Sequence, residues 1–149
     1  RVFGKSILKK DGKVNREKLG KIVFEGESSL LLKLNSITHP EIIRLIRKSI
    51  AKSAKKIVIL DAPLLIEAGL KALVDKLIVV NIDPRIQVKR IQARTKLSRR
   101  QISDRIKRQI PLEKKLRLAD FIIDNSKTFV KTKAQAAEIW KILSEEFIK

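Results

Sequence analysis

The chain has 149 residues, of which 44% are hydrophobic, and this is enough for one domain with a buried core. It has no cysteine, which excludes disulfides, thiolate metal sites and a cysteine nucleophile, and its apolar runs are too short to cross a membrane. The 35 basic residues exceed the 16 acidic ones and give a formal net charge of +19, so an anionic partner is expected.

The first third of the chain predicts helices. Asp11-Gly12 is a turn signal, and Asn15 can cap a short helix that carries apolar residues at helical spacing (Leu19, Ile22, Val23). The run "SSLLLKLNSI" at 28–37 predicts a second helix. Pro40 suits the first position of a third, with Thr38 or His39 as its cap. Residues up to about 54 are therefore predicted to be helical.

Three short β-branched runs follow: "KIVIL" at 56–60, "KLIVVNI" at 76–82 and "DFIIDN" at 120–125. Each is almost continuously apolar, which is typical of strands buried on both faces of a parallel sheet. Helical patterns lie between them, and this alternation predicts an α/β fold.

The helices of this second part have clear start signals. Asp83-Pro84 predicts a helix over 84–96, and Ser98 with Gln101 forms a capping box for a helix over 99–110, which Pro111 ends. A helical pattern over 112–119 follows. Thr132 and Gln135 predict a second capping box, for a terminal helix with one apolar face (Ala136, Ile139, Trp140, Leu143, Phe147).

Candidate chemistry lies where predicted strands end, because ligands of open parallel sheets bind there. Asp61 follows the first predicted strand directly. In many phosphotransferases a carboxylate at this position holds Mg²⁺, but an Asp at a strand end can equally well form a turn or cap a helix. Gln87, Arg90 and Arg94 share one helix face and could clamp phosphates. No residue is assigned as a metal ligand.

The basic charge is concentrated between Arg85 and Arg117, where thirteen residues are basic and two are acidic. For most of them we favour a solvated helix face; single residues such as Arg99 belong to it. A second interpretation is a lid that docks when a polyphosphate neutralises it. The lone His39 is more typical of a cap or a packing residue than of a base.

Several motifs occur together and in a fixed order: "FGKSILKKDGKVNREKLGKIVF", "LNSITHPEI", "DAPLLIEAG", "DKLIVVNIDPRIQVKRIQART" and "RIKRQIPLEKKLRLADFIIDN". Jointly they resemble the dephospho-coenzyme A kinase family over nearly the whole chain. The resemblance implies a P-loop kinase-like parallel sheet flanked by helices. It also implies ATP with Mg²⁺ as cofactors and transfer of a phosphoryl group to the ribose 3′-hydroxyl of dephospho-coenzyme A, the last step of coenzyme A synthesis, in the cytoplasm.

The resemblance also implies a division of the chain and roles for its residues. Residues 1–54 would form a helical coenzyme A-side domain and 55–149 the rest of the nucleotide-binding core, with a lid over about 92–118. Arg90 and Arg94 would stabilise the transferred phosphoryl group, and Gln87 and Asn125 would bind the nucleotide. The residues expected to bind the acceptor are His39, Asp61, Leu64, Leu65 and Glu67.

The family's glycine-rich phosphate loop and first strands have no counterpart in these 149 residues, which do not begin with methionine. In that family the first strand lies between those that match "KIVIL" and "KLIVVNI". We therefore expect the 149 residues on their own to be inactive and poorly folded.

Two alternatives remain open from sequence. Another P-loop nucleotide or nucleoside kinase would share the arginines but not "DAPLLIEAG". A basic nucleic-acid-binding protein would account for the charge, but only 4% of the residues are aromatic, which leaves few platforms for base stacking. No nucleic-acid or membrane partner is expected, and the oligomeric state is not predicted.

Overall fold

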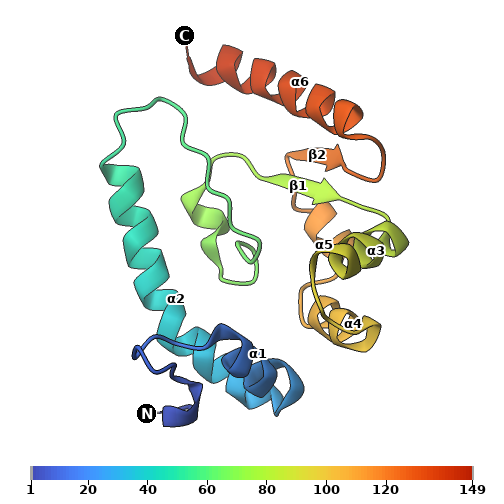
Figure 1. The fold of residues 1–149 in the computed structure, drawn as a ribbon. Helices are drawn as coiled ribbons and strands as arrows, with labels where there is room; N and C mark the ends of the chain where they lie inside the picture. The colour runs from blue at the N-terminus through green and yellow to red at the C-terminus, as the bar shows by residue number, and fades with distance from the viewer. Residues whose placement is uncertain (1, 149) are drawn as a thin grey trace. The chain divides into compact units, whose positions relative to one another are not determined.

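The computed structural model describes residues 2–148 (Figure 1). The chain divides into two compact units, one up to Leu45 and one from Ile46 onward. The prediction of an α/β fold is confirmed, since helices and a small parallel sheet make up the second unit.

The first unit begins with the 3₁₀ helix η1 (Lys5–Ile7) and helix α1 (Arg16–Glu25). Between them the chain reverses at Asp11-Gly12, where Gly12 has a φ of 79°, a left-handed value that favours glycine. Asn15 caps α1 as predicted, because its side chain accepts a hydrogen bond from the backbone N–H of Lys18. Val23 of α1 is only 1% exposed and marks the core of this unit.

Helix α2 (Ser28–Ala51) corrects the prediction of two helices separated at Pro40. Pro40 lies inside the continuous helix, where it lacks the N–H that would bond to the carbonyl of Ser36. Thr38 does not act as a cap, since its hydroxyl donates to the carbonyl of Leu34 within the same helix at 2.9 Å. The flanking helical residues therefore outweigh the local stop signal.

The sheet of the second unit consists of β1 (Ile78–Asn81) and β2 (Phe121–Asp124), which pair in parallel. Its register places Ile78 opposite Phe121 and Asn81 opposite Asp124. Just before the strands, the Asp120 carboxylate accepts a hydrogen bond of 2.7 Å from the backbone N–H of Leu77. This parallel pair confirms two of the three predicted strands.

The third predicted strand is absent: residues 57–60 form no strand in the described chain. Ile59 is 79% exposed and Val58 46%. The apolar β-branched sequence favours an extended chain, but a strand also needs a partner for its backbone groups. No strand among residues 2–148 pairs with this segment.

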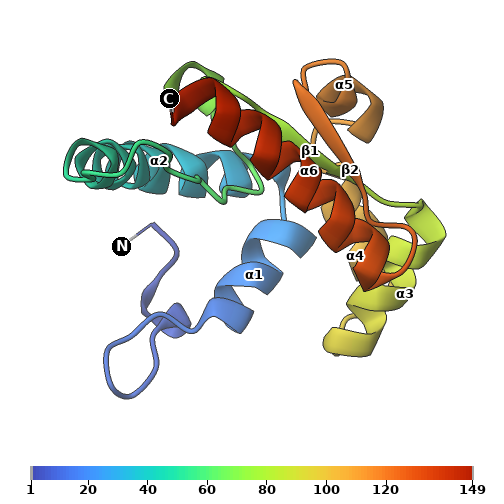
Figure 2. The same cartoon turned by 90° about the horizontal axis from the view of Figure 1, so that it is seen from above.

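Helix α3 (Pro84–Arg94) begins at Asp83, whose carboxylate accepts from the N–H groups of Arg85 and Ile86, as predicted. Helix α4 (Arg99–Lys107) has the predicted capping box of Ser98 and Gln101. Helix α5 (Leu112–Leu116) follows Pro111, and the 3₁₀ helix η2 (Leu70–Leu73) precedes β1. Helix α3 packs on α4, and α5 contacts β1 (Figure 2).

Helix α6 (Phe129–Phe147) packs along β2 (Figures 1 and 2). Its N-cap is Thr128, whose hydroxyl accepts from the N–H of Lys131, so the predicted capping box of Thr132 and Gln135 is wrong. The predicted apolar face is only partly buried: Ile139 is 8% exposed, whereas Trp140 is 48% exposed.

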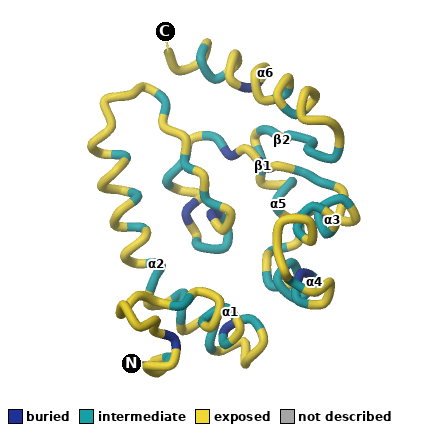
Figure 3. The backbone as a smooth tube through the Cα atoms, in the orientation of Figure 1, coloured by how far each residue is buried: buried dark blue, intermediate teal, exposed yellow. Residues whose placement is uncertain are grey.

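Few residues of the second unit are buried (Figure 3). The buried apolar residues are Leu65, Leu70, Leu77, Val79, Ile102 and Ile139. Within residues 2–148 no helix is both long and apolar enough to cross a bilayer.

Candidate active site

The carboxyl ends of β1 and β2 are tied together by hydrogen bonds beyond the strands themselves. The N–H of Asn125 donates to the carbonyl of Asn81 at 2.8 Å, which extends the ladder by one residue. The N–H of Asp83 donates to the hydroxyl of Ser126 at 2.9 Å. This edge is where ligands of parallel sheets bind, and its backbone is fixed by these contacts.

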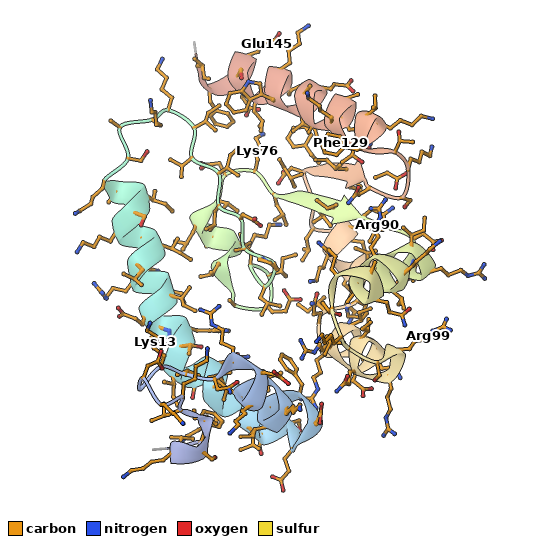
Figure 4. The ribbon with its side chains drawn as sticks, viewed as in Figure 1. Lys13, Lys76, Arg90, Arg99, Phe129 and Glu145 are labelled. Atoms are coloured by element: carbon orange, nitrogen blue, oxygen red, sulfur yellow. The ribbon has the colours of Figure 1, made fainter. Side chains whose placement is uncertain are left out.

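Arg90 of α3 reaches this edge, and its side chain is labelled in Figure 4. Its guanidinium donates to the carbonyl of Asn125 at 2.8 Å and to that of Lys127 at 3.3 Å. The structure therefore brings together two of the predicted site residues, Arg90 and Asn125. A guanidinium has five N–H donors, so these two bonds orient the group and leave donors for a bound anion.

Asn125 connects β2 with the first turns of α6. Its side-chain oxygen accepts a hydrogen bond of 3.1 Å from the hydroxyl of Thr132. The side-chain amide of Gln135 bonds to both backbone groups of Asp124. Its oxygen accepts from the N–H of Asp124 at 2.9 Å, and its nitrogen donates to the carbonyl of Asp124 at 3.0 Å. Thr132 and Gln135 thus support the sheet edge. Their spacing is also that of a capping box, so the sequence alone predicted a cap at these two residues and not this role.

Asp124 and Ser126 form a small polar turn at the same edge. The side-chain hydroxyl and backbone N–H of Ser126 hold the pKa of the Asp124 carboxyl below its ordinary value. The backbone N–H lies 2.8 Å from Oδ1 of Asp124. Ser126 was not predicted as a site residue, although a serine directly after a strand that ends in Asp-Asn is typical of a turn.

Gln87 and Arg94 lie on α3 with Arg90 but differ in exposure. Gln87 is half-buried and lines a cavity next to strand β1, which is described below with its other lining residues. Arg94 lies exposed in the last turn of α3. Arg99 is also exposed and points outward from α4 (Figure 4).

A cavity of about 980 Å³ lies between the extended segment before Asp61, strand β1 and the end of α4. Asp61, which is exposed, and Glu67 line it together with many apolar side chains. The two leucines of the "DAPLLIEAG" loop differ: Leu65 is 6% exposed and packs inward, while Leu64 is 41% exposed. Leu65 lines the cavity, whereas Leu64 is not among its lining residues and exposes its apolar surface to solvent.

Glu67 makes a short ion pair with Lys115. Its Oε1 lies 2.6 Å from the Lys115 ammonium and accepts a hydrogen bond of 3.1 Å from the N–H of Ile110. Burial raises the pKa of Glu67, but Lys115 and the backbone N–H groups together lower it further, so the net pKa lies below the ordinary value. Lys115 was missed because it lies in a basic stretch interpreted as a solvated face.

This shift predicts how stability depends on pH. A carboxyl whose pKa is lowered on folding contributes stability above its unfolded value of 4.5, and this contribution is lost as the pH falls through the folded pKa. Lys115→Met should therefore reduce the acid dependence of the unfolding free energy, because burial alone raises the pKa of Glu67. Urea unfolding of the wild type and of Lys115→Met, measured from above pH 4.5 down into the acid range, tests this prediction. Lys114→Met, which changes an exposed lysine, is the control. Equal acid dependence in all three proteins would contradict it.

His39 lies half-buried within α2, in the sequence of the first unit. Among the described residues no group of three or more His, Cys, Asp or Glu side chains could hold a metal ion.

The fold and this edge define a class of protein: a parallel α/β protein with an oriented arginine at the ligand-binding edge of its sheet. Comparisons with known proteins are specific within this class. The family model described as dephospho-CoA kinase matches residues 1–131. The chain belongs to the dephospho-CoA kinase family.

Individual relatives agree with the family match. The dephospho-CoA kinase of Carboxydothermus hydrogenoformans is 48% identical over 145 residues, which cover 93% of this chain and 70% of the relative. That of Bacillus cereus is 39% identical over 143 residues, 94% of this chain and 71% of the relative. The solved structure of dephospho-CoA kinase from Campylobacter jejuni superposes with a TM-score of 0.63 at 31% identity, over 97% of this chain and 73% of that one.

Proposed function

We propose that this protein transfers the γ-phosphoryl group of ATP to the ribose 3′-hydroxyl of dephospho-coenzyme A, the final step of coenzyme A synthesis. The observation that carries the proposal is the match of the dephospho-CoA kinase model to residues 1–131. The oriented guanidinium of Arg90 at the sheet edge supports it, because phosphoryl transfer depends mainly on positioning and charge stabilisation. The cytoplasm remains the predicted compartment.

In this proposal Arg90 stabilises the charge of the transferred phosphoryl group, and Arg94 assists from the next turn of α3. Asn125 and Gln87 contribute to the nucleotide side, and the exposed Leu64 offers apolar surface to the acceptor. The proposal also divides the chain. A helical domain at 1–54 carries His39 on the acceptor side, and residues 55–149 form the core, with a lid at about 92–118.

Mg²⁺ is the proposed metal, and Asp61 is the residue that would hold it. A magnesium ion bound to ATP needs only one or two protein carboxylates, because phosphate oxygens and water supply its other ligands. The exposed carboxylate of Asp61 at the cavity fits this requirement, and a cluster of three acids is not needed. The ion would neutralise charge on the phosphates.

A binding measurement tests the acceptor. The full-length gene product should bind dephospho-coenzyme A in isothermal titration and should form coenzyme A when ATP and Mg²⁺ are added. It should bind coenzyme A itself detectably, since the apolar loop around Leu64 contacts parts common to both. Binding of a nucleoside monophosphate with no response to dephospho-coenzyme A would instead favour another nucleotide kinase.

A further inference from the structure

One partly buried ion pair joins two segments of the second unit: the loop at 61–69 and helix α5, which follows the turn after α4. Lys115 and Glu67 are 2.6 Å apart, and their side chains are only 13% and 17% exposed. We propose that Glu67 and Lys115 are positioning residues that hold the loop at 61–69, the acceptor loop, against helix α5 and the turn that follows α4. The proposal rests on the function proposed above and assigns Glu67 a role that differs from direct contact with the acceptor.

The loop is a rigid support for Glu67. Successive backbone bonds close it, from the N–H of Leu65 to Ala62 and from the N–H of Ala68 to Leu64, and Gly69 ends it with a φ of 69°. Leu65 packs inward next to Glu67 at 6% exposure. Because the backbone is fixed on both sides, the Glu67 carboxylate has a defined direction.

The opposite side contributes more than one group to this carboxylate. The N–H of Ile110 donates to the same Oε1 that pairs with Lys115. Lys115 also donates to the side-chain oxygen of Gln109 at 3.2 Å. Glu67 therefore holds both the turn that follows α4 and the helix α5, so a displacement of the loop displaces both.

Low exposure distinguishes the Glu67–Lys115 pair from the other charged residues of this basic stretch. Lys114 and Arg117, its neighbours in sequence, are exposed, and exposed ion pairs contribute little. The side chains of Lys115 and Glu67 are mostly shielded from water, so loss of one partner leaves the other charge with less compensation than it has in the pair. Oε2 of Glu67 is buried and has no hydrogen-bond partner in the described chain, so Lys115 and Ile110 supply the compensation through Oε1 alone.

The expected kinetic result is a selective loss of acceptor affinity. Lys115→Met should raise KM for the acceptor about tenfold, which corresponds to about 1.4 kcal/mol, and change KM for ATP by less than about twofold. A purely structural defect would lower the active fraction, and hence the apparent kcat, without this difference between substrates. Lys115→Arg should restore most of the affinity, and Lys114→Met should behave as wild type.

A double-mutant cycle in the full-length gene product completes the test. Glu67→Gln and Lys115→Met should be non-additive for acceptor KM, because either change breaks the same contact. Amide exchange at Ile110 should accelerate in Glu67→Leu, which removes the acceptor of that N–H, whatever the substrate. Additive effects on KM, or unchanged exchange at Ile110, would overturn the proposal. If the wild-type protein does not bind dephospho-coenzyme A but exchange at Ile110 still accelerates in Glu67→Leu, the proposed function would be refuted and the positioning pair would stand.

Discussion

Arg90→Ala is expected to lower kcat by a factor of about 10²–10³, the usual cost of removing one positioned donor to a transition state. KM for ATP should change much less, because the interaction strengthens as charge develops on the transferred group. The two backbone carbonyls that hold the guanidinium, those of Asn125 and Lys127, set its orientation before substrate arrives. Steady-state kinetics of the full-length gene product, with ATP and dephospho-coenzyme A varied separately, measure both quantities.

Two further variants separate catalysis from charge and from structure. Arg90→Lys keeps the charge but cannot reproduce the planar pair of bonds to two carbonyls, so it should recover little activity. Arg99→Ala removes an exposed arginine of α4 and should leave kcat nearly unchanged. A kcat for Arg90→Ala equal to that of the wild type would mean that Arg90 only ties α3 to the loop after β2.

Leu65→Ala is expected to cost about 2–5 kcal/mol of unfolding free energy, because truncation of a buried leucine loses transfer energy and leaves a cavity. Leu65 belongs to the same loop as Glu67 and is only 6% exposed. Urea unfolding of the full-length gene product measures the loss.

The adjacent leucine provides the matched control. Leu64 is 41% exposed, so Leu64→Ala should change stability much less and should instead weaken binding of the acceptor. If Leu64→Ala were the more destabilising of the two, the inward and outward assignments within this loop would be reversed.

Much of the second unit could be predicted because its signals are local. Asp83 and Ser98 each cap a helix through atoms within three residues, so the residues that signal these helix starts are adjacent in the sequence. The strands at Ile78 and Phe121 were predicted from continuous apolar runs, and their parallel pairing followed from the helices between them.

The remaining features depend on partners far away in sequence. The run at 57–60 has the composition of a strand but no pairing strand in the described chain. Pro40 is tolerated inside α2, which a local stop signal cannot anticipate. Lys115 looks like its exposed neighbours until Glu67 is placed beside it. The resemblance to a kinase family predicted Arg90 and Asn125 as site residues, but only the structure shows that they are bonded to each other.

The parallel register also has a consequence for how this unit folds. One sequence separation of 43 residues recurs in three hydrogen bonds, between Glu67 and Ile110, Leu77 and Asp120, and Asp83 and Ser126. None of these bonds can form within a local hairpin, because parallel strands are joined by a long crossover connection. The intervening residues must therefore lose the entropy of loop closure before any of these bonds can form. Helices α3 and α4 can form early from neighbouring residues, whereas the sheet edge that carries Asn125 forms late and as one cooperative step.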